Sequence, residues 1–266
     1  SGEEKDSHRG VAMVAGFIMT MISYFFVLTY GGMVMQAVME EKANRIVELI
    51  VSSVKPFQLM LGKIAGILLV GLFQLLIWAL LLAVIIPIAD KLCGVNIAML
   101  SASGSTAAVP DAGLSDAMIM WLSVMNLPYL EMGIMFLLLF IGGYLLYASV
   151  FAAIGASINE QQDSSQFMMP IMLLMAFSLY AAIYSVENTD GPLAFWASIF
   201  PLSSPIVMMV RIPFGVPLWQ EILSVALLYL TALLGIWGSG RIYRVGILMY
   251  GKKPSLKQMM RWMLKG

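Results

Sequence analysis

Five long stretches without a charged residue restrict the fold of this chain more than any other feature of its sequence. They hold 30, 26, 28, 23 and 19 residues, mostly Leu, Ile, Val, Met and Phe, and about 20 apolar residues suffice for a helix to cross a bilayer. The stretches lack the alternation of a membrane strand. The sequence therefore predicts an all-α, polytopic membrane protein. Its five transmembrane helices are expected at about residues 11–38, 57–88, 130–157, 165–186 and 220–240.

The composition excludes the common classes of soluble protein. Hydrophobic residues make up 61% of the chain and charged residues 11%, with a mean hydropathy of +0.90. Soluble chains hold roughly 45–50% hydrophobic and about 25% charged residues. We therefore expect neither a soluble enzyme nor a nucleic-acid partner. One cysteine, Cys93, and one histidine, His8, indicate no disulfide framework and no metal site. Because no phosphate loop or catalytic motif occurs, we expect no catalytic residue and no cofactor in this chain.

The distribution of basic residues predicts the orientation in the membrane. The loops at 39–63 and 160–163 and the tail at 241–266 hold eleven basic and five acidic residues, which leaves 15 − 11 = 4 basic and 15 − 5 = 10 acidic residues elsewhere. Because Lys and Arg collect on the cytoplasmic side, these segments are predicted to be cytoplasmic and the N-terminus outside. The basic tail is expected to contact anionic membrane lipid. An outside N-terminus without a signal-peptide pattern also predicts a longer polypeptide with at least one further, upstream span.

Residues 39–55 form an amphipathic pattern between the first two predicted spans. One helical face is apolar and the other polar; the residues of the two faces are Met39, Ala43, Ile46, Ile50 and Val54, and Glu41, Arg45, Glu48 and Ser52. Glu41 and Arg45 have the spacing of an ion pair along a helix. The segment is predicted to lie flat on the cytoplasmic face. It is either a surface anchor or a docking helix that transmits force from a cytoplasmic partner into two spans.

Prolines interrupt the apolar residues between the fourth and fifth predicted spans. They are Pro192, Pro201, Pro205, Pro213 and Pro217. Because proline removes a helix hydrogen bond and restricts the preceding residue, we predict two short helices at about 192–200 and 203–212. They would enter and leave one membrane face as an outer re-entrant hairpin within residues 191–217, the alternative being a broken sixth span. Residues 90–128, whose first half is rich in Gly, Ser, Ala and Thr, are predicted to be an outer loop.

No acidic residue stands at the middle of a predicted span, which bears on how transport would be powered. Glu131 and Glu221 lie at the outer ends of their spans. Carboxylates at mid-membrane depth usually mark proton or ion relays. The energy for any uphill transport is therefore expected to come from another chain.

Three segments carry a resemblance to a known family. They are residues 40–50 (EEKANRIVELI) with 52–63 (SSVKPFQLMLGK), residues 200–205 (FPLSSP) leading to Met208, Arg211 and Ile212, and residues 241–254 (RIYRVGILMYGKKP). In this order of helices, the chain resembles spans two to six of a type-2 ATP-binding-cassette (ABC) exporter permease, in the NatB-like branch. The resemblance covers most of the chain, and residues 90–128 are a longer outer insertion than the family pattern.

The resemblance implies partners and candidate sites. It implies a first span and a large outer domain upstream, a second permease in a homo- or heterodimer, and cytoplasmic ATPase subunits that hold ATP and Mg²⁺, in a bacterial inner membrane. Residues 39–55 would be the coupling helix, and the hairpin would close the exit of the pathway. The expected ATPase contacts are Glu40, Glu41, Lys42, Arg45, Glu48, Leu49 and Ser52. The hairpin residues are Pro201, Pro205 and Arg211, and the candidates for the pathway or the permease–permease seam are Thr20, Tyr24, Gln36 and Gln74.

Three other functions compete with an ATP-driven exporter. A self-powered secondary carrier or channel would transport without an ATPase. An intramembrane enzyme would need a catalytic His, Ser or carboxylate pair at membrane depth, which the sequence does not offer. A scaffold or assembly factor would leave ATP-driven flux unchanged on deletion. The sequence does not choose among sodium, lipid-like molecules, peptides and drugs as substrates.

Overall fold

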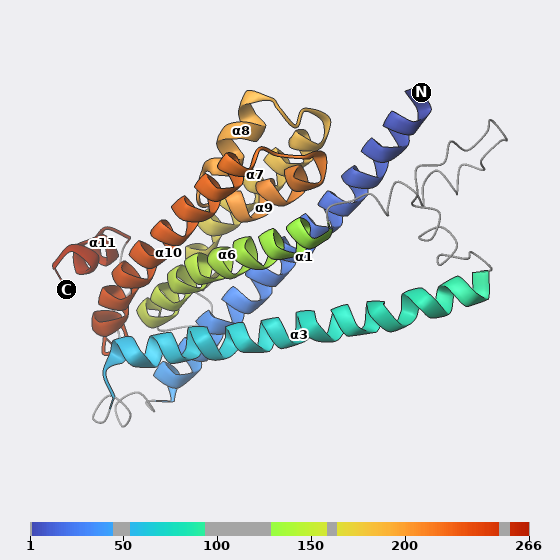
Figure 1. The fold of residues 1–266 in the computed structure, drawn as a ribbon. Helices are drawn as coiled ribbons and strands as arrows, with labels where there is room; N and C mark the ends of the chain where they lie inside the picture. Colours follow the sequence, from blue (N-terminus) through green and yellow to red (C-terminus); the bar gives the residue numbers. More distant parts are fainter. Residues whose placement is uncertain (1, 45–53, 94–128, 159–163, 250–255, 266) are drawn as a thin grey trace.

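The computed structural model describes residues 2–44, 54–93, 129–158, 164–249 and 256–265, and within these ranges the regular secondary structure is helical, without strands (Figure 1). Five helices are long and apolar enough to cross a membrane. They are α1 (Gly2–Ala43), α3 (Pro56–Cys93), α6 (Tyr129–Ser157), α7 (Ser164–Glu187) and α10 (Leu218–Gly246). The prediction of an all-α, polytopic membrane protein with five such helices is confirmed.

Two short helices stand between α7 and α10, in the proline-rich segment. They are α8 (Pro192–Ile199) and α9 (Ser204–Arg211), followed by a single 3-10 turn, η2 (Ile212–Phe214). Each begins with a proline in its first two positions, where the missing N–H group breaks no helical hydrogen bond. Gly215 ends the turn with a φ of 81°, a left-handed conformation that glycine adopts without strain.

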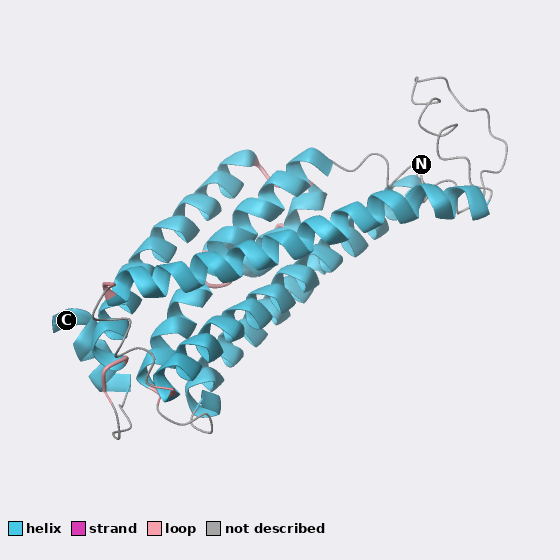
Figure 2. Cartoon of the chain, turned by 90° about the horizontal axis from the view of Figure 1, so that it is seen from below, coloured by secondary structure: helices cyan, strands magenta, loops and turns pink. Residues whose placement is uncertain are grey.

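Helix α6 is the centre of the bundle, and α3 is its most exposed member. In the most apolar 18-residue stretch of each helix, 61% of α6 is buried, but only 6% of α3. The difference arises because α6 packs between α1 and α10. Met60 and Ile64, near the start of α3, are buried in the core, whereas Leu80 and Ile85, further along, are exposed. Figure 1 shows the second half of α3 standing away from the other helices. Viewed from below, the other long helices lie side by side (Figure 2).

Close backbone contact joins α1 to its neighbours at two glycines. A Cβ atom on Gly155 of α6 would come within 2.7 Å of the Met35 carbonyl oxygen, and one on Gly16 of α1 within 2.7 Å of the Val210 carbonyl oxygen of α9. Small residues of this kind let helices in a membrane approach closely. Helix α1 is therefore held against α6 in its second half and against α9 in its first half.

The first helix ends later than the sequence predicts. Helix α1 continues through Ala43, so residues 39–43 of the predicted coupling helix extend the first span and no separate helix begins at Met39. The reason is that Glu40, Glu41 and Lys42 are good helix formers and no glycine or proline interrupts them. Ala43, expected on the apolar face, is exposed. Residues 45–53 and the predicted outer loop at 94–128 lie outside the described residues.

The C-terminal tail returns to the bundle. Helix α11 (Leu256–Lys265) packs against α10, and its Met259 is buried in the core. The Arg241 guanidinium lies 4.0 Å from the centre of the Trp237 ring and donates a hydrogen bond to the Met263 carbonyl oxygen at 3.2 Å. Part of the tail that the sequence assigns to lipid thus contacts protein.

Candidate functional site

Three long helices end at one buried ammonium group. Lys42 lies in the last turn of α1 and is 2% exposed. Its Nζ donates hydrogen bonds to the carbonyl oxygens of Ala156, at 2.6 Å, and Gly246, at 2.8 Å. Ala156 is next to the last residue of α6, and Gly246 is the last residue of α10. We call Lys42 with these two carbonyls the Lys42 node.

Backbone physics explains why a lysine occupies this place. The last four carbonyls of a helix have no partner within the helix, and the C-terminal end carries a partial negative charge that attracts cations. One ammonium group therefore satisfies acceptors of two helices at once, by charge-assisted hydrogen bonds. The sequence predicts that Lys42 contacts an ATPase, but the structure places its ammonium inside the bundle, on carbonyls of this chain.

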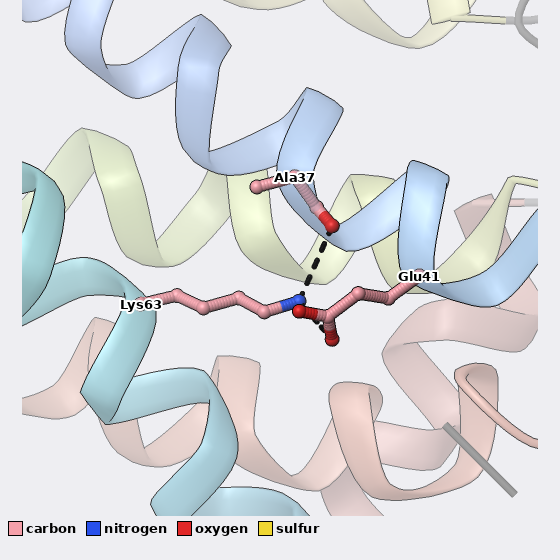
Figure 3. A network of polar contacts seen from close by, with 3 residues as sticks. All are labelled: Ala37, Glu41 and Lys63. Atoms are coloured by element: carbon pink, nitrogen blue, oxygen red, sulfur yellow. Dashed lines mark hydrogen bonds and ion pairs between the residues drawn. The ribbon is translucent and has the colours of Figure 1, made fainter. Parts of the chain in front are cut away.

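The residue before Lys42 joins α1 to α3. The Glu41 carboxylate and the Lys63 ammonium form an ion pair at 2.5 Å, and Lys63 also donates to the Ala37 carbonyl oxygen at 3.3 Å (Figure 3). The side chains are 27% and 11% exposed, respectively. Glu41 thus pairs with the next span, whereas Arg45, its predicted partner, lies outside the described residues.

The remaining predicted ATPase contacts lie at the same end of the bundle or outside the described residues. Glu40 is exposed at the end of α1. The others are outside the described part of the chain: Arg45, Glu48, Leu49 and Ser52. Contact of this segment with an ATPase stays a prediction.

A second buried cation organises the other end of the bundle. Arg211, in the last turn of α9, is 2% exposed. Its Nε donates to the Thr189 carbonyl oxygen at 2.9 Å, Nη1 to the Ser198 hydroxyl at 2.5 Å and Nη2 to the Gln220 carboxamide oxygen at 3.1 Å. These acceptors belong to the turn after α7, to α8 and to α10. We call this group the Arg211 node.

The charge of Arg211 survives its burial. Loss of solvent lowers the pKa of the guanidinium from its ordinary value, and the negative charge of Asp190 raises it. The ordinary pKa of an arginine side chain is so far above neutral pH that the guanidinium keeps its proton in proteins. The Arg211 node is thus a permanent cation whose planar fork fixes the relative orientation of three segments.

Helix α1 also fixes the start of α9. The Thr20 hydroxyl donates to the Ile206 carbonyl oxygen at 3.1 Å, and the Ser23 hydroxyl to the Pro205 carbonyl oxygen at 3.0 Å. Both side chains are fully buried. Thr20, a candidate for the pathway or the seam between permeases, therefore faces α9, and Pro205, a predicted hairpin residue, takes part in the same contact.

The four candidates for the pathway or seam differ in burial. Thr20 is buried, Tyr24 and Gln74 are half-buried, and Gln36 is exposed. Tyr24 packs against the main core cluster. In the hairpin, Pro201 is half-buried and precedes Leu202, whose carbonyl oxygen accepts a hydrogen bond from the Tyr147 hydroxyl at 2.5 Å.

An apolar cavity, which sequence reasoning missed, lies between α1, α3 and α6. Its volume is about 650 Å³. Its walls include Met19 of α1, Leu72 and Trp78 of α3, and Met132 and Phe136 of α6. The cavity can hold an apolar chain or ring but offers few hydrogen-bonding groups. Because its walls come from three separated segments, no local sequence pattern signals it.

Comparison with known proteins identifies the family. The family model described as ABC-2 family transporter protein matches residues 7–241. The chain is 27% identical over 257 residues to the uncharacterized protein YhaP of Bacillus subtilis, covering 96% of this chain and 56% of YhaP. It is 25% identical over 266 residues to the uncharacterized protein MJ1024 of Methanocaldococcus jannaschii, covering 99% of this chain and 57% of MJ1024.

The chain thus spans somewhat more than half the length of these two relatives. No solved structure matches it. The match of the family model extends from the first part of α1 to near the end of α10 and includes all five long helices. The chain therefore belongs to the ABC-2 family of transporter membrane proteins.

Proposed function

We propose that this chain is the permease part of an ATP-driven exporter, which moves a solute out of the cytoplasm when a separate ATPase closes on residues 39–55. ATP and Mg²⁺ would be bound by the ATPase, and a second permease, identical or different, would complete the pathway. Family membership supports the permease role. The observation that carries the coupling role is the Glu41–Lys63 ion pair, which joins the start of the predicted coupling helix to α3, the span that follows it.

The distribution of charge supports the proposed orientation in the membrane. Lys42 and Lys63 lie at the end of the bundle where α1, α6 and α10 finish and α3 begins. The exposed Arg244, near the end of α10, belongs to the same end. Because basic residues face the cytoplasm, this end would be cytoplasmic, in the inner membrane of a bacterium. The Arg211 node would then lie near the outer face, where α8 and α9 would close the exit as a re-entrant hairpin.

A charge reversal at Arg45 tests the coupling role. Arg45→Glu should leave insertion and ATPase binding intact but lower solute export per ATP hydrolysed by roughly tenfold, because couplings of this kind are worth 1–3 kcal/mol. The measurement is ATP-driven uptake into inverted vesicles, in which the cytoplasmic face is outside, with the co-purifying ATPase present and a panel of sodium, lipid-like, peptide and drug probes. Arg244→Glu, a reversal of an exposed arginine at the same end, is the matched control.

Two outcomes would contradict the proposal. Unchanged export per ATP in Arg45→Glu would remove residues 39–55 from the coupling. Flux of the same probes through vesicles that lack any ATPase would identify a self-powered carrier or channel instead.

A further inference from the structure

Lys42 connects more of the bundle than a residue that only stabilises one helix end. Its ammonium bonds α6 and α10, and the preceding residue, Glu41, bonds α3 through Lys63. Successive side chains of a helix point about 100° apart, so the last turn of α1 is attached on different sides to three other spanning helices. These attachments lie in the first residues of the predicted coupling helix, which the structure shows as the last turn of α1.

We infer that Lys42 is a positioning residue for transport: it makes the ends of α6 and α10 follow α1 when the segment after Ala43 is moved. This inference rests on the proposed function, because the moving force would come from the ATPase. It adds the route by which motion reaches spans that the coupling helix does not adjoin in sequence.

The close packing around the node explains why a buried charge is needed there. A Cβ atom on Gly246 would lie 3.0 Å from the Ala156 carbonyl oxygen, so the ends of α6 and α10 are in contact. The Ala156 and Gly246 carbonyl oxygens accept from one nitrogen, so they lie close enough to repel one another when no donor lies between them. An apolar side chain at position 42 would leave both carbonyls without the ammonium, and burial of such groups without a donor is unfavourable.

The chemistry of the Lys42 contacts would let them persist while the helices move. A lysine ammonium is a compact charge on a flexible stem, so it can keep both carbonyls within reach while the helices tilt. Because both acceptors are backbone carbonyls, no side-chain rotation in α6 or α10 can remove them from the ammonium. The Lys42 node therefore behaves as a pivot, which holds three helix ends together through a change of angle.

Amine labelling of the wild-type protein is the first test, and it needs no variant. Acetic anhydride in limiting amount should modify Lys42 at least roughly tenfold more slowly than Lys55, because reagent reaches a buried group only through local opening. Lys55 is exposed at the same end of the bundle. Mass spectrometry of peptides gives both rates, and equal rates would overturn the inference.

Distance measurement is the second test. Spin labels at Ala43 and Leu248, both exposed, report the separation of the α1 and α10 ends in the full chain in nanodiscs, with Cys93 replaced by serine. Lys42→Met should lengthen and broaden this distance in the chain alone. Lys42→Arg should restore most of it, and Arg244→Met, which removes an exposed cation from the end of α10, should leave it unchanged.

Trapping the co-purified ATPase with ATP and vanadate separates positioning from stability. The wild-type distance between the labels should stay constant on trapping because the ends move together, whereas the Lys42→Met distance should change. If the Lys42→Met distance equals the wild-type distance, with and without trapping, the inference about Lys42 is wrong, but the proposed function as an ATP-driven exporter still stands. Failure of any ATPase to bind would overturn the proposed function, yet the labelling rates and the distances in the chain alone would still decide the role of Lys42.

Discussion

The two ends of the bundle are each organised by one buried cation, but the two cations differ in what they hold. Lys42 bonds two backbone carbonyls at the ends of long helices, whereas Arg211 bonds one carbonyl in the turn after α7 and two side chains, one in α8 and one at the start of α10. A flexible ammonium permits a change of angle, whereas a planar guanidinium with three partners does not. The comparison supports the proposed pivot at the Lys42 end and, for the proposed exit, a rigid closure at the Arg211 end.

The strongest test of this contrast is at the rigid end. Arg211→Met should lower the free energy of unfolding by about 3 kcal/mol, because it leaves one buried and two part-buried acceptors without their donor. Thermal unfolding in detergent micelles measures the change. Arg211→Lys should recover less than half of it, since one ammonium cannot reach acceptors on three segments in the directions of the fork. Full recovery by lysine would show that the node needs only a charge and would remove its assignment as a rigid closure.

A smaller effect is expected for the partly exposed ion pair beside the pivot. Glu41→Gln should lower the free energy of unfolding by roughly 0.5–1 kcal/mol, the usual range for an ion pair in contact with solvent. A double-mutant cycle with Lys63→Met measures the pairwise contribution. A coupling energy as large as the effect of Arg211→Met would mean that Glu41 and Lys63, rather than Lys42, dominate this end.

The helices could be predicted from the sequence because their signals are local. Stretches without charge predict the five long helices, and prolines at the starts of α8 and α9 predict two short ones. In each case a physical requirement, either the length needed to cross hydrocarbon or the missing N–H group of proline, acts on neighbouring residues.

The role of Lys42 could not be predicted because its partners are backbone atoms. The carbonyls of Ala156 and Gly246 become acceptors only because α6 and α10 end there, and any residue carries the same carbonyl group. The same applies to Thr20, whose acceptor is the Ile206 carbonyl. The amphipathic pattern of residues 39–55 also suggests a helix separate from α1, whereas the structure continues α1 through Ala43.

Photo-crosslinking from the predicted coupling helix tests whether the ATPase contacts residues 39–55 during ATP hydrolysis. A photoreactive amino acid in place of Glu48 should form a covalent product with the ATPase while ATP is being hydrolysed. The same amino acid in place of Asn188, which is exposed near the Arg211 node, should not. We expect the ATPase product from position 48 and not from position 188. Lipid adducts alone at position 48, while nucleotide is consumed, would refute coupling through this segment.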